Sequence, residues 1–146
     1  MTEEALAIYD ASAQVFKVFD IKTKGVMFTV KEHPGIGTVN GLQLEGHTLV
    51  YIKARNIIVH DISTEDPPKV IQRDSLLRTV ALKNKLVAVG DDFGKIYLVH
   101  LGSKSVTVQT LHWHAHRVHS LLFVPETPYL LSAGEESVVV QWHLET

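Results

Sequence analysis

Four similar segments follow one another along this chain, and their spacing limits the folds that it can adopt. A repeat of about 40 residues is typical of proteins that stack one supersecondary unit against the next, because a single unit cannot bury both of its faces. The middle residues of the four matching tripeptides are 41, 39 and 43 positions apart. These tripeptides are Phe19-Asp20-Ile21, His60-Asp61-Ile62, Val99-His100-Leu101 and Trp142-His143-Leu144.

The last segment shows most clearly what the repeated unit is. It contains three apolar runs, at residues 118–123, 129–133 and 138–142, which are separated by turn residues such as Pro125 and Gly134. Runs of about five residues that are rich in Val and Leu, at spacings of roughly ten, predict β-strands. A helix would need apolar residues every three or four positions over a longer window. We therefore predict a three-stranded antiparallel meander, with room upstream for a fourth strand.

The same alternation of short apolar runs and turns continues through the whole chain and predicts about 14 strands. Grouped by the repeat, these strands form units at residues 1–32 (partial), 33–73, 74–112 and 113–146 (partial). The predicted fold is all-β, a single domain of about three and a half four-stranded antiparallel units.

Three residues of the last unit carry a family resemblance. His114 lies four positions before Val118, Ser132 lies in the second predicted strand, and Trp142 lies in the third. This set resembles the signature of WD-repeat proteins, in which these residues join an aspartate in a buried chain of hydrogen bonds. Glu136 occupies the aspartate position. The resemblance implies a WD-repeat β-propeller, whose units are called blades, and a structural role for these four residues.

The other predicted blades match the signature less well, and the number of blades is small. His33 is only a rough equivalent of His114. A propeller closes with at least four blades and more often seven, and an open ring exposes unpaired strand edges. We therefore expect the ring to be partial, as a fragment of a longer propeller, or to be completed by a partner protein or a second copy of the chain.

A narrower resemblance concerns residues 111–146. Trp113-His114, the stretch 130–134 and the stretch 142–146 are similar to nucleolar WD-repeat subunits of the small-subunit processome, in its t-UTP group. This resemblance implies a non-catalytic scaffold in ribosome biogenesis, placed in the nucleolus among other WD-repeat and helical-repeat proteins. The alternative is a general WD-repeat adaptor that binds a peptide or partner protein in another nuclear or cytoplasmic complex.

Composition excludes several other classes of protein. The formal net charge of −2 does not indicate a dedicated nucleic-acid or membrane-surface protein, and the absence of cysteine excludes a disulfide framework. The first ten residues are acidic and lack the apolar run of a signal peptide. No stretch approaches the roughly 18 apolar residues that a membrane span requires. We expect an intracellular protein with no membrane contact.

Motifs that suggest enzymes are incomplete. Four histidines are close enough in sequence to suggest zinc, but no carboxylate or thiolate with ligand spacing accompanies them. Asp92-Phe93-Gly94 matches the magnesium motif of kinases in its letters only, without the other kinase motifs. Gly35, Gly37 and Gly41 do not have the dinucleotide-binding spacing. We expect no enzymatic activity, no cofactor and no metal. The four histidines are His112, His114, His116 and His119.

Charged residues are predicted to gather on both rims of the propeller segment. One rim holds the loops that precede first strands and the turns between second and third strands. It would carry the candidate contact residues Arg55, Arg73, Lys95 and Arg117, together with the acidic residues Glu32, Asp74, Asp91, Asp92, Glu135 and Glu136. Binding of nucleic acid without sequence preference needs a continuous basic surface. Because the charges are mixed, we expect protein partners, with pre-rRNA contact that is minor or indirect.

Overall fold

The computed structural model describes residues 5–35, 37–102 and 106–144, so the extreme ends of the first and last predicted blades lie outside the described residues. These residues form strands joined by turns and loops, and no helix occurs among them. The strands are β1 (Ala5–Asp10), β2 (Val15–Asp20), β3 (Val26–Lys31), β4 (Val39–Glu45), β5 (Thr48–Lys53), β6 (Asn56–Asp61), β7 (Lys69–Gln72), β8 (Leu77–Lys83), β9 (Leu86–Asp91), β10 (Lys95–Leu101), β11 (Val106–His112), β12 (Val118–Phe123), β13 (Tyr129–Gly134) and β14 (Val139–His143).

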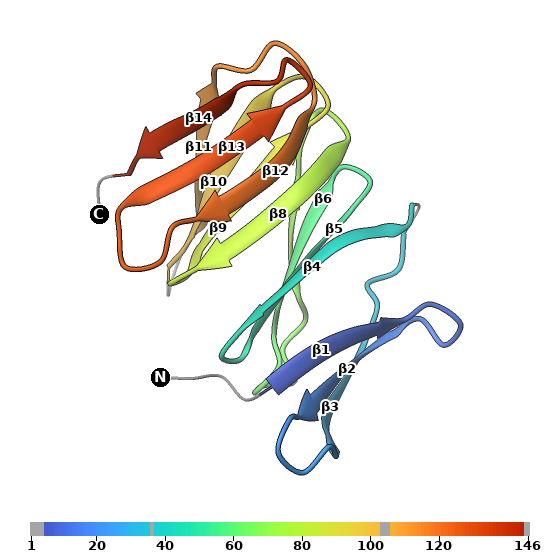
Figure 1. Ribbon diagram of the computed structural model, residues 1–146. Coiled ribbons are helices and arrows are strands. Elements are labelled where there is room, and N and C mark those ends of the chain that lie inside the picture. Colours follow the sequence, from blue (N-terminus) through green and yellow to red (C-terminus); the bar gives the residue numbers. More distant parts are fainter. Residues whose placement is uncertain (1–4, 36, 103–105, 145–146) are drawn as a thin grey trace.

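The strands pair into four separate antiparallel sheets that follow one another along the chain (Figure 1). The two middle sheets have four strands, β4 to β7 and β8 to β11, and the two end sheets have three, β1 to β3 and β12 to β14. The first strands of successive sheets lie side by side, β4 beside β8 and β8 beside β12. This arrangement confirms the predicted all-β propeller segment of four-stranded blades with partial end blades.

Tight turns join neighbouring strands within each sheet. At the turn between β8 and β9, Asn84 and Lys85 have φ angles of 49° and 63°. Two successive residues with positive φ give the type I′ geometry, whose twist matches that of a hairpin. In the two-residue turn between β4 and β5, Gly46 alone has a positive φ, 59°, at the first turn position, where type II′ turns place glycine. These turns keep consecutive strands antiparallel, as the spacing of the apolar runs predicts.

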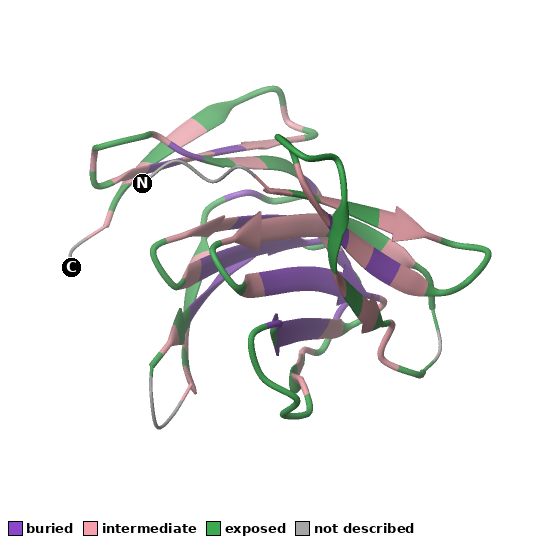
Figure 2. Ribbon diagram, turned by 90° about the horizontal axis from the view of Figure 1, so that it is seen from below, coloured by how far each residue is buried: buried purple, intermediate pink, exposed green. Residues whose placement is uncertain are grey.

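Apolar side chains fill the spaces between neighbouring sheets in three clusters. In the middle sheets, the second and third strands are buried on both faces, so that five consecutive residues of β5 are buried. In the end sheets, buried and more accessible residues alternate, as in β2 and β13. Figure 2 shows the buried residues concentrated in the central strands. Each end sheet therefore packs through one face and leaves its other face open.

Candidate functional site

The four signature residues of the last sheet form one chain of hydrogen bonds. The indole Nε1–H of Trp142 donates to Ser132 Oγ at 2.9 Å, and Ser132 Oγ lies 2.7 Å from His114 Nε2. His114 Nδ1 is hydrogen-bonded to the carboxylate of Glu136. Because a carboxylate only accepts, Nδ1–H donates to Glu136; in that tautomer of the neutral ring Nε2 accepts, so Ser132 donates to Nε2 and accepts from the indole. These hydrogen bonds connect the loop before β12 with β13, with β14 and with the turn between those two strands.

A glycine provides the room that the longer glutamate needs. A Cβ atom on Gly134 would lie 2.4 Å from Glu136 Oε1 and 3.1 Å from His114 Nδ1, so a side chain at this position would displace the carboxylate. Desolvation by burial acts to raise the pKa of Glu136, but the hydrogen bond and charge interaction with His114, together with the backbone N–H groups of His116 and Ala115, outweigh it and the pKa is lowered. Glu136 therefore remains an ionised acceptor at neutral pH. Its other carboxylate oxygen accepts from the backbone N–H of His116 at 3.3 Å.

Ser132→Ala should destabilise the protein by about 2–3 kcal/mol, because it leaves the buried donor of Trp142 and the buried acceptor of His114 without partners. The measurement is urea denaturation followed by tryptophan fluorescence. Ser63→Ala is the matched control, since Ser63 Oγ also bonds a side chain, Asp61, but at an exposed turn. Equal losses of unfolding free energy in the two variants would contradict a stabilising network in the last sheet.

The second sheet has a network at the same positions, built from different residues. Tyr51 on β5 and His60 on β6 have the same register relation as Ser132 and Trp142. The backbone N–H of His33 donates to the hydroxyl of Tyr51 at 2.7 Å, and that hydroxyl lies 3.2 Å from His60 Nε2. Burial raises the pKa of Tyr51 to about 12, so it remains a neutral donor. His33 thus contributes its backbone amide where His114 contributes its ring.

His60 should make stability depend on pH. Desolvation by burial, with a smaller contribution from His33, lowers the pKa of His60 below its ordinary value of 6.5. As pH falls below 6.5, the unfolded chain takes up a proton that the folded chain resists, so His60 lowers the free energy of unfolding progressively.

His60→Gln should therefore have a flatter stability–pH profile between pH 7 and 5 than the wild type, measured by denaturation at each pH. The exposed His119, changed to Gln, should leave the profile unchanged. Parallel profiles for wild type and His60→Gln would contradict the assigned role.

In the third sheet, the polar network lies two residues further along the second strand than in the last sheet. The positions equivalent to Ser132 and Trp142 are Val89 and Val99, both fully buried. The polar role passes to Asp91 at the end of β9, which is also fully buried. The prediction of Asp91 as a solvated rim residue is therefore wrong, because its carboxylate turns inward to meet buried donors.

Four donors surround the carboxylate of Asp91. Ser75 Oγ donates to Oδ2 at 2.5 Å and the hydroxyl of Tyr97 donates to the same oxygen at 3.2 Å. The backbone N–H groups of Phe93 and Lys95 donate to Oδ1 at 2.9 and 2.8 Å. Sequence reasoning missed this set, although Ser75 precedes its first strand as His114 precedes β12. The position of Ser75 before the first strand of its sheet is the sequence signal that could have revealed the donors around Asp91.

A buried ion pair joins the first two sheets. Lys53 Nζ lies 2.5 Å from Glu32 Oε2, with both side chains about 5% exposed or less, and it also donates to the carbonyl of His33 at 2.8 Å. The hydroxyl of Tyr9 donates to the other oxygen of Glu32. The prediction that Glu32 adds its charge to the rim surface is wrong, because its carboxylate turns inward to meet the buried donors of Lys53 and Tyr9.

The rim of the third and fourth sheets has two exposed aromatic side chains, and two of its arginines bond the same carboxylate. Asp92 Oδ1 accepts from Arg78 Nε at 2.5 Å and from Arg117 Nε at 2.9 Å. The hydrogen bond from Arg78, reinforced by Arg117 against desolvation, lowers the pKa of Asp92. Phe93 and Trp113 are 65% and 54% exposed. This rim cluster could contact a peptide through apolar and cationic side chains.

The remaining candidate rim residues lie at turns and strand ends of the second and third sheets. The guanidinium of Arg73 lies 5.4 Å from the ring centre of Tyr97, and its Nε donates to the carbonyl of Gln72. Arg55 is exposed in the turn between β5 and β6, and Lys95 is half-buried at the start of β10. The backbone N–H of Arg73 donates to the carbonyl of Arg55 at 2.8 Å, so these two residues are neighbours, and a contact surface shared by the four residues stays a prediction.

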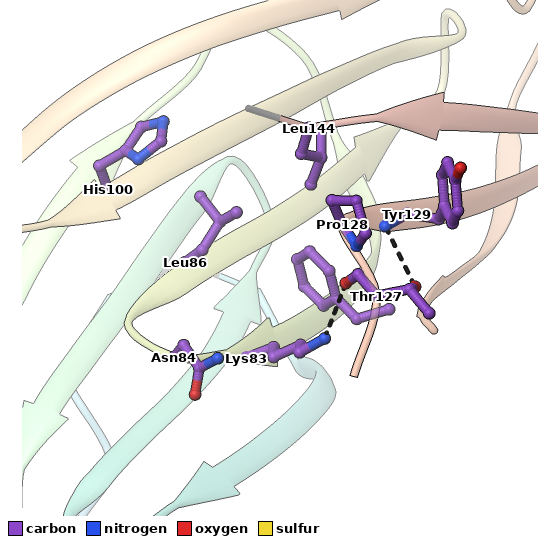
Figure 3. A pocket seen from close by; sticks show the side chains of 9 residues that line it. Lys83, Asn84, Leu86, His100, Thr127, Pro128, Tyr129 and Leu144 are labelled. Atoms are coloured by element: carbon purple, nitrogen blue, oxygen red, sulfur yellow. Dashed lines mark hydrogen bonds between the residues drawn. The ribbon is translucent and has the colours of Figure 1, made fainter. Parts of the chain in front are cut away.

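A cavity of about 270 Å³ lies between the third and fourth sheets at the opposite rim (Figure 3). Its walls are mainly apolar and include Leu86, Phe123 and Pro128. The ammonium of Lys83 donates to the carbonyls of Val124 and Thr127, each at 3.1 Å, so its charge is already engaged. The cavity suits an apolar side chain.

The described residues contain neither a metal-type cluster nor a membrane-spanning helix. No three His, Asp or Glu side chains converge there as metal ligands. His114 is committed to its network, while His112, His116 and His119 are exposed. No helix that could cross a bilayer is present in the same part of the chain.

Two curated relatives resemble parts of the chain, whereas no family model matches it. It is 39% identical to U3 small nucleolar RNA-associated protein 17 of Schizosaccharomyces pombe over 71 residues, which are 48% of the chain and 9% of that protein. It is 47% identical to WD repeat-containing protein 75 of Danio rerio over 58 residues, 38% of the chain and 7% of that protein. The chain thus matches less than a tenth of the length of either relative.

Solved structures share the fold at low sequence identity. The computationally designed Ika4 protein superposes with a TM-score of 0.75 and 18% identity, over 99% of this chain and 88% of that one. A WD-repeat propeller chain of the mitotic checkpoint complex superposes with a TM-score of 0.78 and 16% identity, over 97% of this chain and 43% of that one. With its successive antiparallel sheets and these similarities, the chain has the fold of a β-propeller segment, and in its signature hydrogen bonds and in sequence it resembles WD-repeat proteins.

Proposed function

We propose that the chain is part of a non-catalytic scaffold of the small-subunit processome, which acts in pre-rRNA transcription and processing in the nucleolus. The observation that carries this proposal is the 39% identity to a protein named for its association with U3 small nucleolar RNA. The second relative is a WD-repeat protein by name. The expected partners are other protein subunits, among them WD-repeat and helical-repeat proteins.

The disposition of polar groups supports a scaffold. The buried histidines, the buried carboxylate of Asp91 and the Glu32–Lys53 pair all bond within or between sheets, where they hold blades together. On the rim of the third and fourth sheets, Asp92 pairs with both nearby arginines. Since RNA binding without sequence preference requires a strongly basic surface and the net charge is −2, any RNA should be reached through partner proteins.

The test is recovery of U3 RNA with the tagged chain from nucleolar extract. We expect U3 RNA to be enriched about tenfold or more over an unrelated WD-repeat protein expressed at the same level. Processome proteins should remain bound after RNase treatment, because the proposed contacts are between proteins. No enrichment of U3 RNA, with the chain folded by circular dichroism, would contradict the proposal.

A second candidate function is a general adaptor that captures a peptide on one rim. The observation that favours it is the exposure of Phe93 and Trp113 beside Arg78 and Arg117. Phe93→Ala combined with Trp113→Ala should then abolish recovery of one client protein. Under the scaffold proposal, the same double variant should keep most of the processome proteins.

A further inference from the structure

The first strand of the second sheet, β4, contains an Asn–Gly pair at an irregular point of its pairing. Val39 and Leu42 of β4 pair with two residues of β5 that have only one residue between them, whereas Asn40 and Gly41 both lie between Val39 and Leu42. Two residues on one strand therefore face a single residue on the other, which is a β-bulge. In a bulge the extra residue is left out of the ladder and the ladder is locally disrupted.

Both residues of the pair are accessible to water. Asn40 and Gly41 are exposed, and the carboxamide of Asn40 makes no hydrogen bond to another residue that the structure describes. β4 is also an edge strand, paired with β5 alone. The sheet itself lies in the middle of the chain, with a neighbouring sheet on each side (Figure 1). The side chain of Asn40 and the peptide group that follows it are thus open to solvent within a folded, flanked sheet.

An asparagine followed by glycine is chemically labile, because the backbone nitrogen of the next residue can attack the side-chain carbonyl carbon. Glycine has no Cβ atom to shield that nitrogen, and its backbone adopts conformations that other residues disfavour. Gly41 already has such a conformation, with a φ of 106°. The other two asparagines of the chain, Asn56 and Asn84, precede isoleucine and lysine. Only Asn40 combines the labile dipeptide with an exposed bulge.

We propose that Asn40–Gly41 is a site of spontaneous deamidation, at which Asn40 is converted to isoaspartate. The backbone nitrogen of Gly41 forms a bond to Cγ of Asn40, and the side-chain NH2 leaves as ammonia together with the proton of the Gly41 N–H. This closes a five-membered succinimide ring. Water then opens the ring at one of its two carbonyls and gives either aspartate or isoaspartate. The reaction needs no oxidant, reductant or enzyme, and the inference does not rest on the proposed function.

Isoaspartate weakens the packing of the second sheet on the third. It is joined to Gly41 through its side-chain carbon, so the backbone of β4 becomes one carbon longer at the bulge. There is little room for this change, because a Cβ atom on Gly41 would lie 3.0 Å from Val80 Cγ1 and 3.5 Å from Ile52 Cγ1. Val80 and Ile52 belong to the buried apolar cluster between these two sheets. The longer backbone and the new negative charge therefore disturb this cluster.

The first test is incubation of the purified, folded chain at neutral pH for several days. Products are located by peptide mass spectrometry and by carboxyl methylation with an isoaspartyl methyltransferase. Isoaspartate should form at Asn40 about tenfold or more faster than at Asn84, the internal control, which is also exposed but precedes Lys85. Asn40→Gln should remove the methylated product.

A parallel incubation in urea shows what the fold contributes. Because the bulge leaves the pair exposed, the rate at Asn40 in the folded chain should stay within about tenfold of the rate in the unfolded chain. Equal rates at Asn40 and Asn84 in the folded chain would overturn the proposal. The absence of isoaspartate at Asn40 in the folded chain would also overturn it, whatever the unfolded chain forms.

The second test measures the effect on packing. The isoaspartate form is separated by chromatography, and its urea midpoint is compared with that of freshly purified Asn40→Asp. This variant carries the same new charge on a backbone of normal length, so it should unfold close to the wild type. The isoaspartate form should unfold at a clearly lower urea concentration. Equal midpoints would overturn the inferred effect, since the longer backbone would then leave the contact with Val80 intact.

Discussion

Replacing Gly94 by alanine should destabilise the protein by about 3–5 kcal/mol, among the largest effects of any single methyl group in this chain. Gly94 has a φ of 87°, a conformation that side chains disfavour. A Cβ atom there would also lie 1.9 Å from the carbonyl oxygen of His114 and 2.9 Å from that of His116. These are backbone atoms, so the turn between β9 and β10 must separate from the loop that positions His114.

Gly46→Ala is the matched control. Gly46 also has a positive φ, 59°, but an added Cβ meets nothing within 4 Å, so only the backbone strain of about 1 kcal/mol remains. Urea denaturation should show the difference, and limited proteolysis of Gly94→Ala should cut first within the last sheet. Similar unfolding free energies for the two variants would mean that the third and fourth blades do not depend on this close approach.

Asp91→Ala should cost about 3–5 kcal/mol, because it leaves two hydroxyl and two backbone N–H donors without a charged acceptor in a fully buried place. Asp91→Asn should cost less, since its remaining amide oxygen can still accept from the backbone donors of the turn. The measurement is the free energy of unfolding in urea at neutral pH.

Asp61→Ala is the comparison for this change. Asp61 also caps a turn, accepting from the backbone N–H and hydroxyl of Ser63, but it is exposed. Water replaces the lost acceptor there, so the cost should stay within about 1 kcal/mol. If Asp91→Ala proved no more costly than Asp61→Ala, the buried network of the third sheet would not be what stabilises it.

The strands of this protein could be predicted because their signals are local. Alternating apolar residues and turn residues such as Gly46 set each strand and each hairpin within a few positions of one another. The last strand begins at Val139, one residue later than the predicted run, which is an ordinary difference at a strand end. The signature residues His114, Ser132 and Trp142 were also recognisable, since their spacing depends on one sheet alone.

The polar networks of the other sheets could not be read in the same way. Nothing in the letters around Glu32 shows that its carboxylate faces inward, because its partners come from other strands, and the burial of Asp91 is signalled only by the position of Ser75 before its first strand. The partners of Glu32, Tyr9 and Lys53, lie 23 and 21 positions away and even belong to different sheets. Only packing of one sheet on the next brings such groups together and removes the water that would otherwise solvate them.

The sequence by itself determined the β-strand repeat of about 40 residues, the blade order and the hydrogen-bonding set of the last blade. Each of these follows from the conformational preference of short stretches and from the periodicity of apolar side chains. The tertiary structure alone decided which charged residues are buried between blades and which apolar faces of the end sheets stay open. Burial depends on what packs against a face, and that is a property of neighbouring sheets that no single stretch contains.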